Sequence, residues 1–485
     1  MNAPLRRLSV AVLVLFGLLL VNVNYLQVVR AEDLHNDSHN SRLIAEEYSR
    51  QRGPIVVGGK QVARSVETND RLKYLRTYSD GPLYAPATGF YSLVYGATGI
   101  EQQANSVLAG TDDSLFVRRI IDLLTGVKPK GGSVKLTLNP DAQKAAYDGL
   151  RARKARGAVV AIDPSTGAIL AMVSTPSFDP NELASHDTAE VRESYNRLES
   201  RPSRPMLNRA LRQTYPPGST FKIVTAAAAL ESGRYSPDSK VDNGAQLDLP
   251  LTDDQLPNYD NAPCNPAGTA TLTDALMRSC NVAFGKLGIE LGDDAIRAQA
   301  EKFGFNEAFK VPMRSVASRY PEDLDAPQTA LSAIGQFDVR ATPLQMAMVV
   351  AAVANRGVLM SPYLIQDVLA PNFTVLDSTK PSSLGEAVSP QTAADLTEML
   401  VAVVEDGTGT NAQIPGIQVA GKTGTAQQGP GKKPHAWFVS FAPADVDPKV
   451  AVAVVLEEGG DAPEVSGNEL AAPIAQEVMK AVLGR

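Results

Sequence analysis

One uncharged run near the start of the chain constrains its organisation more than any other feature. Residues 8–29 (LSVAVLVLFGLLLVNVNYLQVV) form a run of 22 residues without a charge. A helix of that length spans roughly 33 Å, which is enough to cross the hydrocarbon core of a bilayer. No second apolar run in the sequence approaches this length. The sequence therefore predicts one membrane-spanning segment followed by a large folded part.

The charges beside this run predict its orientation. Arg6 and Arg7 precede it, and basic residues flanking a span favour the cytoplasmic side. Residues 1–7 are therefore expected to be a cytoplasmic tail, with everything after Arg30 outside the membrane. A cleaved signal peptide is the alternative, because residues 29–31 loosely fit a small-residue cleavage site. The run is long for a signal core, so we expect a retained signal anchor and a single-pass protein of the cell membrane.

Composition excludes several classes of function. The chain has 485 residues, of which 44% are apolar, and a net charge of -7. It can bury a core, and it has no excess of basic residues with which to bind nucleic acid. Its four His and two Cys lack the short spacings of a zinc site. His35 and His39 could form a metal pair, but a solvated linker is the favoured interpretation because no third ligand is near. We expect no metal and no cofactor.

Patterns along the chain indicate two folded domains. Residues 30–150 begin as a polar spacer and continue with short β-rich runs and a polar helical stretch over residues 101–125. A Pro/Gly/Lys cluster at residues 127–132 suggests a hinge. Residues 157–174 predict a β-hairpin that turns at residues 163–167. We therefore expect a smaller N-terminal domain over 30–150 and a second domain over 151–485.

A serine and a lysine open a helical stretch in the second domain. Residues 215–218 (YPPG) form a turn ahead of Ser219, and the alanine-rich residues after Lys222 favour a helix. Ser219 is expected near the helix N-terminus, where free N–H groups and the helix dipole favour an oxyanion. Lys222 falls on the same face, and a desolvated lysine can be the base that a serine nucleophile needs. Alone, such a pair is usually a helix cap beside a surface lysine.

Two further motifs follow in a fixed order. Residues 279–281 (SCN) lie at the end of a predicted helix over 271–278, and residues 422–425 (KTGT) lie ahead of a predicted strand over 436–441. The order Ser-x-x-Lys, Ser-x-Asn, Lys-Thr-Gly is that of β-lactamases and penicillin-binding proteins. Three motifs in this order leave little room for chance.

The chain resembles the class B penicillin-binding proteins, specifically the actinobacterial PbpA type. Beyond the three motifs, the resemblance is carried by residues 157–174, 208–210, 335–336, 342–347, 407–409 and 435–438. It spans about residues 150–485, and the N-terminal part resembles the family less specifically, chiefly at residues 52–55. One departure is Cys280, which stands where the usual second motif has Asp. That position varies in the family, so activity is still expected.

The resemblance implies a peptidoglycan D,D-transpeptidase. Ser219 would attack the D-Ala-D-Ala bond of a donor stem peptide, release D-Ala and hold the rest as an acyl-enzyme. An amine of a second strand would then take the acyl group and form the crosslink. β-Lactams would acylate Ser219 because they imitate the donor. A D,D-carboxypeptidase activity, with water as the acceptor, uses the same motifs and stays open.

The resemblance also implies roles for the other motif residues. Lys222 would be the base, Ser279 would pass the proton to the leaving nitrogen, and Asn281 would bind the donor backbone. Lys422 would be a fixed cation that polarises the site. Substrate binding falls to the third motif, whose hydroxyls would hold the terminal carboxylate and whose residues are Thr423, Gly424 and Thr425. The backbone N–H groups of Ser219 and Thr425 would form the oxyanion hole.

Several residues have structural interpretations. Cys264 and Cys280 are an even pair in an oxidising compartment, which makes a disulfide the favoured hypothesis and two buried thiols the alternative. The bond would stabilise by roughly 3 kcal/mol in the chain-entropy model and brace the second motif. His435 and Trp437 are expected to be structural rather than catalytic.

The fold and partners follow from the same resemblance. We expect an α/β (α+β) transpeptidase domain like that of serine β-lactamases, with a five-stranded antiparallel sheet flanked by helices. An elongated, mixed N-terminal pedestal or dimerisation-type domain and one transmembrane helix would precede it. The implied partners are peptidoglycan stem peptides, β-lactams, a SEDS-family glycosyltransferase and division or elongation proteins.

Other functions fit the sequence less well. A class A β-lactamase needs a Glu-x-x-Leu-Asn loop, and residues 321–325 (PEDLD) have Pro where that Glu should be. A bifunctional class A protein needs a glycosyltransferase domain, for which residues 31–150 are too few. A β-lactam sensor would usually have several membrane spans, and a silent scaffold would not need all three motifs.

Overall fold

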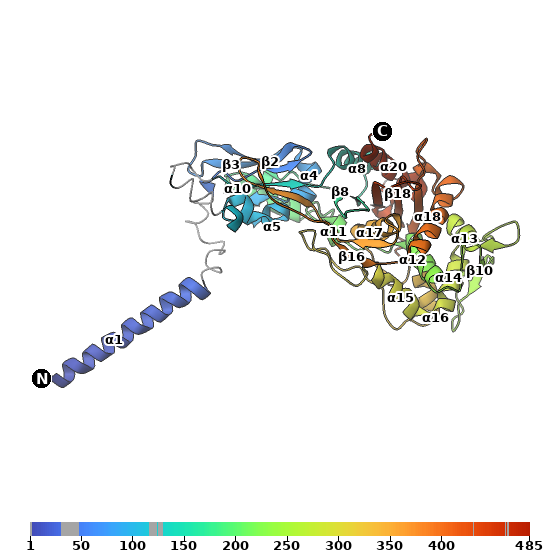
Figure 1. Cartoon of the computed structure of the whole chain (residues 1–485), viewed down its shortest axis with the longest axis horizontal. Helices are drawn as coiled ribbons and strands as arrows, with labels where there is room; N and C mark the ends of the chain where they lie inside the picture. Colours follow the sequence, from blue (N-terminus) through green and yellow to red (C-terminus); the bar gives the residue numbers. More distant parts are fainter. Residues whose placement is uncertain are drawn as a thin grey trace.

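The computed structural model describes residues 2–30, 48–115, 124, 130–429, 431–460, 462 and 465–485. Figure 1 shows an N-terminal helix that stands apart, a strand-rich part, and a larger part that carries the C-terminus. The candidate metal pair His35 and His39 and most of the polar spacer lie outside the described residues.

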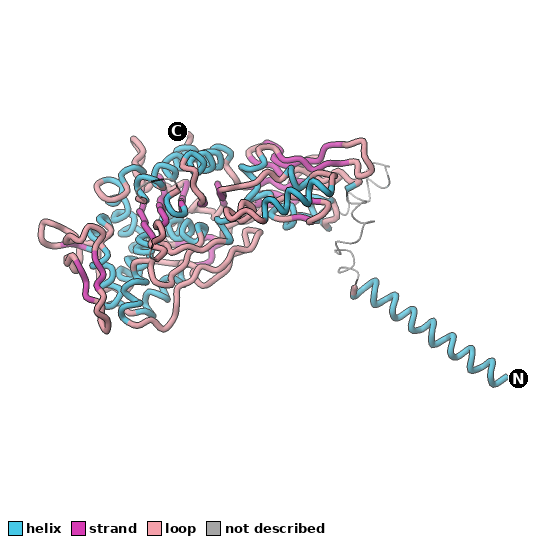
Figure 2. Tube along the Cα trace, turned by 180° about the vertical axis from the view of Figure 1, so that it is seen from behind, coloured by secondary structure: helices cyan, strands magenta, loops and turns pink. Residues whose placement is uncertain are grey.

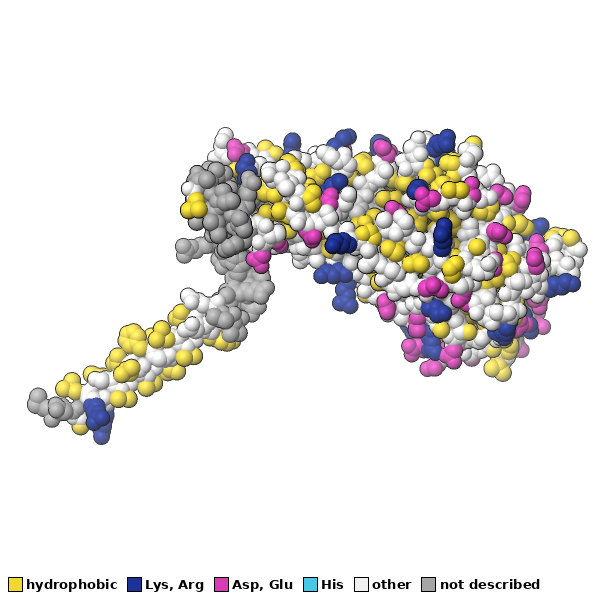
Figure 3. All heavy atoms as spheres, viewed as in Figure 1, with side chains coloured by type: hydrophobic (Ala, Val, Ile, Leu, Met, Phe, Trp, Pro, Cys, Tyr) yellow, Lys and Arg dark blue, Asp and Glu magenta, His cyan; other side chains and the backbone are white. Residues whose placement is uncertain are grey.

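The first helix has the properties of a membrane span. Helix α1 (Asn2–Asn24) continues into a π-helical turn, η1 (Tyr25–Val29). Within the described residues, one helix is long and apolar enough to cross a membrane, over Ala3–Gln27, and none of its most apolar part is buried against protein. Apolar side chains cover the helix, and its basic side chains, Arg6 and Arg7, lie near the N-terminal end (Figure 3). The length and composition of α1 therefore fit a single-pass anchor.

A six-stranded sheet forms the part nearest the anchor. Its strands, in spatial order, are β15 (Val375–Ser378), β14 (Ile365–Leu369), β6 (Ser133–Leu136), β1 (Ile55–Val57), β2 (Lys60–Glu67) and β3 (Tyr74–Tyr78). Strands β1 and β6 are parallel, and the other neighbours are antiparallel. Two strands from late in the chain thus complete this sheet, and they appear in orange among the blue strands of Figure 1. The sequence analysis placed the residues of these two strands in the second domain, over 151–485, and did not predict that they join this sheet.

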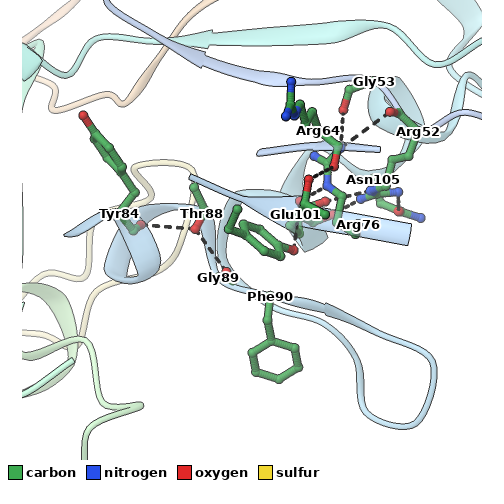
Figure 4. A network of polar contacts seen from close by, with 12 residues as sticks. Arg52, Gly53, Arg64, Arg76, Tyr84, Thr88, Gly89, Phe90, Glu101 and Asn105 are labelled. Carbon is green, nitrogen blue, oxygen red and sulfur yellow. Dashed lines mark hydrogen bonds and ion pairs between the residues drawn. The ribbon is translucent and has the colours of Figure 1, made fainter. Parts of the chain in front are cut away.

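A buried ionic cluster holds this part together (Figure 4). Glu101 is fully buried in α5 (Gly99–Gln103) and accepts hydrogen bonds from Arg52 Nε at 2.7 Å and Arg76 Nε at 2.6 Å. Burial raises the pKa of Glu101, but Arg76 and Arg52 outweigh this and hold it below its ordinary value. Arg52 also donates to the Glu101 carbonyl at 2.6 Å and to Asn105 Oδ1 at 2.6 Å. Arg52 therefore lies at the junction where α5 gives way to α6 (Asn105–Ala109). Up to residue 115, the predicted helical stretch is two short α-helices followed by the 3₁₀ turn η2 (Asp113–Leu115).

A five-stranded antiparallel sheet forms the centre of the larger part. Its order is β17 (Ala420–Ala426), β18 (His435–Ala442), β19 (Val450–Leu456), β7 (Gly157–Ile162) and β8 (Ile169–Thr175). All neighbouring strands are antiparallel. Strands β7 and β8 confirm the predicted hairpin, and the whole sheet confirms the expected transpeptidase architecture.

Helices cover both faces of this sheet. Helices α8 (Pro140–Ala152) and α20 (Ala472–Leu483) pack on one face, and α17 (Pro343–Ala354) packs on the other. The residues of strand β19 are apolar throughout because both of its faces are covered. Val452 and Val454 join the core under α8 and α20, whereas Ala453 and Val455 join the core under α17. Alternate side chains of a strand point to opposite faces, so a sheet covered twice needs both sets apolar. Figure 2 shows the helices around these strands from behind.

The remaining elements are mostly short. Residues 81–88, for which the sequence analysis predicted no element, form a helix. The predicted β-rich run over 89–95 contributes only two strand residues. Gly89 and Gly96 adopt positive φ angles at the ends of this run, which interrupts the extended backbone. These elements are α4 (Gly81–Thr88), β4 (Tyr91–Ser92), β5 (Gly96–Ala97), η2 (Asp113–Leu115), α9 (Asn181–Ala184), α10 (Thr188–Glu199), α11 (Arg209–Arg212), β9 (Lys240–Val241), β10 (Gln246–Asp248), β11 (Gln255–Pro257), β12 (Ala270–Thr271), α15 (Asp293–Lys302), α16 (Ala326–Ala333), β13 (Val358–Met360), β16 (Ser383–Glu386), α18 (Pro390–Glu405), η4 (Thr410–Ala412), η5 (Glu457–Gly459) and α19 (Gly467–Leu470).

Candidate active site

Ser219 lies in a tight turn held against the sheet. The 3₁₀ turn η3 (Gly218–Phe221) leads directly into helix α12 (Lys222–Glu231). Gly218 has φ +54°, and a Cβ there would lie 2.9 Å from the Thr425 carbonyl oxygen, so only glycine permits this approach. The Gly218 N–H donates to the Gly335 carbonyl at 2.9 Å, and Trp437 Nε1 donates to the Pro216 carbonyl at 3.0 Å. These contacts place half-buried Ser219 beside the third motif.

Lys222 is the first residue of α12 and is fully buried. Its Nζ donates to the Ser279 carbonyl at 2.7 Å and to Asn281 Oδ1 at 2.9 Å, and it lies 3.4 Å from Ser279 Oγ. Burial lowers the pKa of Lys222 well below its ordinary value, and the positive charge of Lys422 lowers it further. An amine whose pKa is lowered in this way loses its own proton more readily and can then act as a base.

Ser279 lies at the junction of two helices. It ends helix α13 (Leu272–Arg278) in the left-handed conformation, with φ +63°, and Cys280 caps helix α14 (Asn281–Leu291). A non-glycine residue in this region costs about 1–3 kcal/mol and persists only where its surroundings hold it. Here the reversal directs the carbonyl and hydroxyl of Ser279 and the amide of Asn281 toward Lys222. The second motif therefore meets the first through one buried amine.

Lys422 brings the third motif to the same hydroxyl. It is fully buried in β17, and its Nζ donates to Ser279 Oγ at 2.8 Å and to the Thr423 carbonyl at 3.1 Å. Burial lowers the pKa of Lys422 to about 7. A pKa of about 7 is lower than the expectation of a fixed cation assumes, and the role of Lys422 stays a prediction. Ser279 Oγ lies between two amines, at 3.4 Å from Lys222 and 2.8 Å from Lys422.

The other residues of the third motif line β17 next to the serine turn. Gly424 is buried, and a Cβ there would lie 2.9 Å from Thr220 Cγ2 and 3.0 Å from Trp437 Cβ. Thr423 and Thr425 share the opposite face of the strand because alternate residues do so. Thr425 is half-buried and pairs with Ala436 of β18.

Thr408 joins the third motif to the end of α13. The sequence analysis named residues 407–409 as part of the family resemblance but gave Thr408 no role. Thr408 Oγ1 forms a 2.7 Å hydrogen bond with Thr423 Oγ1, and the Thr408 N–H donates to the Met277 carbonyl at 3.3 Å. A Cβ on neighbouring Gly407 would lie 2.6 Å from that same carbonyl, so the turn is pressed against the end of α13. The sequence feature that could have indicated this role is Gly-Thr-Gly at residues 407–409. It places a polar residue between two glycines just ahead of the strand that carries Lys-Thr-Gly.

A disulfide anchors the second motif from outside. Cys264 and Cys280 are bonded, with their Cα atoms 5.6 Å apart, and both are buried. Asn258 Oδ1 accepts the Val282 N–H at 3.0 Å, and Asn281 Nδ2 donates to the Pro257 carbonyl at 3.0 Å. The loop after β11 thus holds the turn at Ser279 by covalent and polar contacts.

His435 and Trp437 lie on β18, away from the two amines. Trp437 is fully buried and anchors the serine turn through its indole N–H. Burial lowers the pKa of His435 to about 4, and its Nδ1 accepts the Glu458 N–H at 3.2 Å. Both contacts are those of structural residues.

Comparisons with known proteins agree with this arrangement. A family model described as the penicillin binding protein transpeptidase domain matches residues 157–480, and one described as the penicillin binding protein A dimerisation domain matches residues 52–134. The peptidoglycan D,D-transpeptidase PbpA of Mycolicibacterium smegmatis is 46% identical over 490 residues, which cover 100% of this chain and 99% of that protein. The protein of the same name from Mycobacterium tuberculosis is 44% identical over 490 residues, with the same coverage of both chains.

Solved structures give the same result. Penicillin-binding protein A from M. tuberculosis as a ceftriaxone acyl-enzyme complex superposes with a TM-score of 0.88 at 43% identity, covering 90% of this chain and 100% of that one. Its penicillin G acyl-enzyme complex superposes with a TM-score of 0.86 at 43% identity, with the same coverage.

Proposed function

This chain belongs to the class B penicillin-binding proteins of the PbpA type and is a penicillin-binding peptidoglycan D,D-transpeptidase, and we propose that Ser219 carries its acyl group. The observation that supports this assignment is the meeting of the three motifs around one hydroxyl. Ser279 Oγ lies between the buried amines of Lys222 and Lys422. Ser219 lies in η3, the turn that leads directly into α12, and Lys222 is the first residue of that helix.

Acylation begins with a proton transfer to Lys222. Neutral Lys222 takes the proton of Ser219 Oγ as that oxygen attacks the carbonyl carbon of the D-Ala-D-Ala bond, which gives a tetrahedral oxyanion. The N–H groups of Ser219 and Thr425 stabilise this charge. The proton then passes from Lys222 through the Ser279 hydroxyl to the leaving amine as the C–N bond breaks. Free D-Ala departs, and the donor remains as an ester of Ser219.

Lys422 and its neighbours hold the donor and the relay. A protonated Lys422 donates to Ser279 Oγ and fixes the direction in which that hydroxyl can donate. Thr423 and Thr425 bind the terminal carboxylate of the donor, and buried Gly424 keeps the strand close to the serine turn. Asn281 orients the donor backbone next to Lys222.

Deacylation reverses these steps with a different nucleophile. The amine of a second stem peptide attacks the ester, Lys222 accepts its proton through Ser279, and the proton returns to Ser219 Oγ as the C–O bond breaks. The product is a crosslinked peptide. Water in place of the amine would give a carboxypeptidase, and a donor peptide offered with and without an amine acceptor separates the two activities. Release of the uncrosslinked acid alone, with acceptor in excess, would contradict the transpeptidase assignment of the site.

The anchor and the resemblance to the family support a location and a set of partners. We place residues 1–7 in the cytoplasm, the span over residues 8–29, and the folded part outside, because Arg6 and Arg7 precede the span. Protease added to intact cells should then digest the folded part, and full protection would contradict this orientation. A SEDS-family glycosyltransferase and division or elongation proteins are the proposed partners. If none of these proteins co-purifies with the chain from crosslinked membranes, the result would count against this proposal.

The rate of penicillin acylation should depend on pH in a bell-shaped manner. It rises with pH on the acidic side because Lys222 must lose its proton to act as a base. It falls on the alkaline side, above the pKa of about 7 of Lys422, because the charge that holds Ser279 is lost. The two limbs report apparent pKa values of the coupled pair. Second-order acylation rate constants between about pH 5 and about pH 9 provide the measurement.

A substitution at Lys422 checks the assignment of both limbs. Lys422→Met should acylate slowly and lose the alkaline limb. Its acidic limb should move to higher pH, because removing the neighbouring positive charge raises the pKa of Lys222. An acidic limb that moves to lower pH, or an alkaline limb that persists, would be incompatible with these roles.

Loss of the Thr408 hydroxyl should weaken binding of the donor carboxylate. Thr408→Val keeps the shape of the side chain but removes the 2.7 Å hydrogen bond that orients Thr423 Oγ1. We expect an apparent affinity for penicillin that is weaker by up to about tenfold, with the acylation rate at saturation nearly unchanged, because a hydrogen bond between two neutral hydroxyls is worth about 0.5–1.5 kcal/mol. Stopped-flow acylation over a range of penicillin concentrations separates the two quantities.

Two further variants control this experiment. Thr408→Ser should restore the affinity because it restores the hydroxyl. Thr410→Val removes the neighbouring hydroxyl that accepts from Asn468 Nδ2, and it should leave the affinity unchanged. A fall in the saturating rate with unchanged affinity would show that Thr408 does not act through the carboxylate site.

A further inference from the structure

A polar cavity of about 600 Å³ lies beside the acyl site without containing any of its motif residues. It sits at the end of the sheet where β17 ends and β18 begins, next to the residues that lead into the serine turn. Tyr215 and Pro216, which precede Ser219, line one side, and Gln427 and Gln428, which follow Thr425, line another. A peptide extended along β17 advances about 3.3 Å per residue, so a substrate in the acyl site reaches this cavity within two or three residues.

The inner wall of the cavity is a fixed ionic network. Glu457 accepts from Arg209 Nε at 2.9 Å and from the Tyr215 hydroxyl at 2.8 Å, and it pairs with Arg156 Nε at 3.1 Å. Arg156 also pairs with Glu458 at 3.1 Å. Both carboxylates of the cavity are therefore neutralised, and neither repels an anion strongly. With its pKa lowered to about 4, His435 adds no charge at neutral pH.

Two more guanidinium groups lie at the mouth of the cavity. Arg340 donates to the carbonyls of Phe337 at 3.1 Å and Val339 at 3.0 Å, and its nearest carboxylate contact, to Asp338, is 3.9 Å long. That carboxylate is already engaged by Arg319 at 2.9 Å. In the part of the chain that the structure describes, the exposed guanidinium of Arg204 makes no hydrogen bond or ion pair.

The backbone positions of these two arginines are held firmly. The Arg204 carbonyl accepts from Arg209 Nη1 at 3.1 Å, so the ionic network of the inner wall also fixes the base of Arg204. Arg340 is joined to Arg319 by two backbone hydrogen bonds, at 2.7 Å and 2.9 Å. The cavity thus has four guanidinium groups and two carboxylates, and the excess positive charge is at its open side.

Amide side chains complete the lining. Gln213, Gln336, Gln427 and Gln428 all face the cavity, and amide N–H groups can donate to carboxylate oxygens as guanidinium groups do. Guanidinium groups bind carboxylates through two parallel N–H···O bonds, which adds geometric selectivity to the charge. The lining is therefore suited to an anionic group on an extended peptide rather than to an apolar or cationic one.

We propose that this cavity binds a free carboxylate of a peptidoglycan stem peptide at a residue outside the D-Ala-D-Ala bond. The inference rests on the proposed function, because it takes the acyl site at Ser219 as the fixed end of the substrate. The carboxylate can belong to the donor or to the acceptor, since both strands converge on Ser219. Arg204 and Arg340 contact it, and Arg156 and Arg209 form the wall behind them.

Matched substrates and two variants of the full-length protein test this proposal. One pair of donors ends in D-Ala-D-Ala and differs only by a carboxylate or a carboxamide on the preceding residue. A pair of amine acceptors differs in the same way. Wild-type protein should use the carboxylate form of one pair about tenfold more efficiently in kcat/KM, the change that 1.4 kcal/mol produces. Arg204→Ala and Arg340→Ala should each reduce this preference, and the double variant should abolish it.

The controls separate this proposal from the proposed function. Penicillin acylation should be unchanged in both variants, which shows that the fold and the acyl site are intact. Arg192→Ala removes an exposed arginine of α10 outside the cavity and should keep the preference. Arg340→Glu should reverse it, so that the carboxamide is used better than the carboxylate.

Each outcome has one meaning. A preference confined to the donors or to the acceptors supports the proposal and identifies the strand that carries the carboxylate. No preference in wild-type protein, or a preference that survives in the double variant, overturns it. Failure of wild-type protein to form a penicillin adduct would instead contradict the role of Ser219.

Discussion

Ser219→Ala is expected to abolish acyl-enzyme formation. Without the hydroxyl there is no nucleophile, and Lys222 has no proton to accept in the first step. Removing the nucleophile of a comparable serine enzyme costs about 10⁶-fold in rate, so no adduct should be detectable. Intact mass of the detergent-solubilised full chain, followed over time with benzylpenicillin, provides the measurement.

A matched serine serves as the control. Ser232 lies at the other end of α12, where its hydroxyl donates to the Ala229 carbonyl at 2.6 Å. Ser232→Ala should form the adduct at the wild-type rate. A penicillin adduct that persists in Ser219→Ala would assign the acyl group to another residue, and consumption of the drug by wild-type protein without an adduct would indicate a hydrolase.

Replacing Glu101 with alanine should destabilise the part nearest the membrane by about 3–5 kcal/mol, because it removes the carboxylate that pairs with two buried arginines. Arg52 and Arg76 both donate to the Glu101 carboxylate, and the two arginines are 5% and 2% exposed (Figure 4). The Tyr78 hydroxyl, 3.2 Å from the same carboxylate, loses its acceptor as well. Urea unfolding measures the loss of stability, and hydrogen exchange of the amides in β1, β2 and β3 assigns the loss to this sheet.

The location of Glu101 makes the effect separable from catalysis. Penicillin acylation should be largely retained below the unfolding transition, since the acyl site lies on the other sheet. Glu67 is an exposed carboxylate on β2, and Glu67→Ala should change stability by less than about 0.5 kcal/mol. An equally small loss in Glu101→Ala would mean that the cluster contributes no net stability.

The site was more predictable than the fold of the first domain. Ser219 and Lys222 are predicted from their place at the start of an alanine-rich helix. Ser279 and Lys422 are predicted from the order of the three motifs, and their roles follow from the family resemblance. Thr408 was given no role because one threonine between two glycines has no chemical signature of its own. Its role depends on Met277 and Thr423, which approach it only in the folded chain.

The two late strands of the first sheet escaped the sequence analysis for a similar reason. Strand β15 is exposed along its whole length, so it has neither the apolar run of a buried strand nor the alternation of a half-buried one. Strand β14 is half-buried and short. Nothing local in these residues indicates that they complete a sheet begun by β1, β2 and β3.

The sequence by itself determined the single anchor, the hairpin of β7 and β8, the strand β18, and the order of the three motifs. These features depend on neighbouring residues, through length without charge, periodicity and spacing. Only the tertiary structure decided that Lys422 has a pKa of about 7, that late strands join the first sheet, and that arginines gather in a cavity beside the acyl site. Burial, strand pairing and charge clustering depend on which distant residues meet, and spacing along the chain does not carry that information.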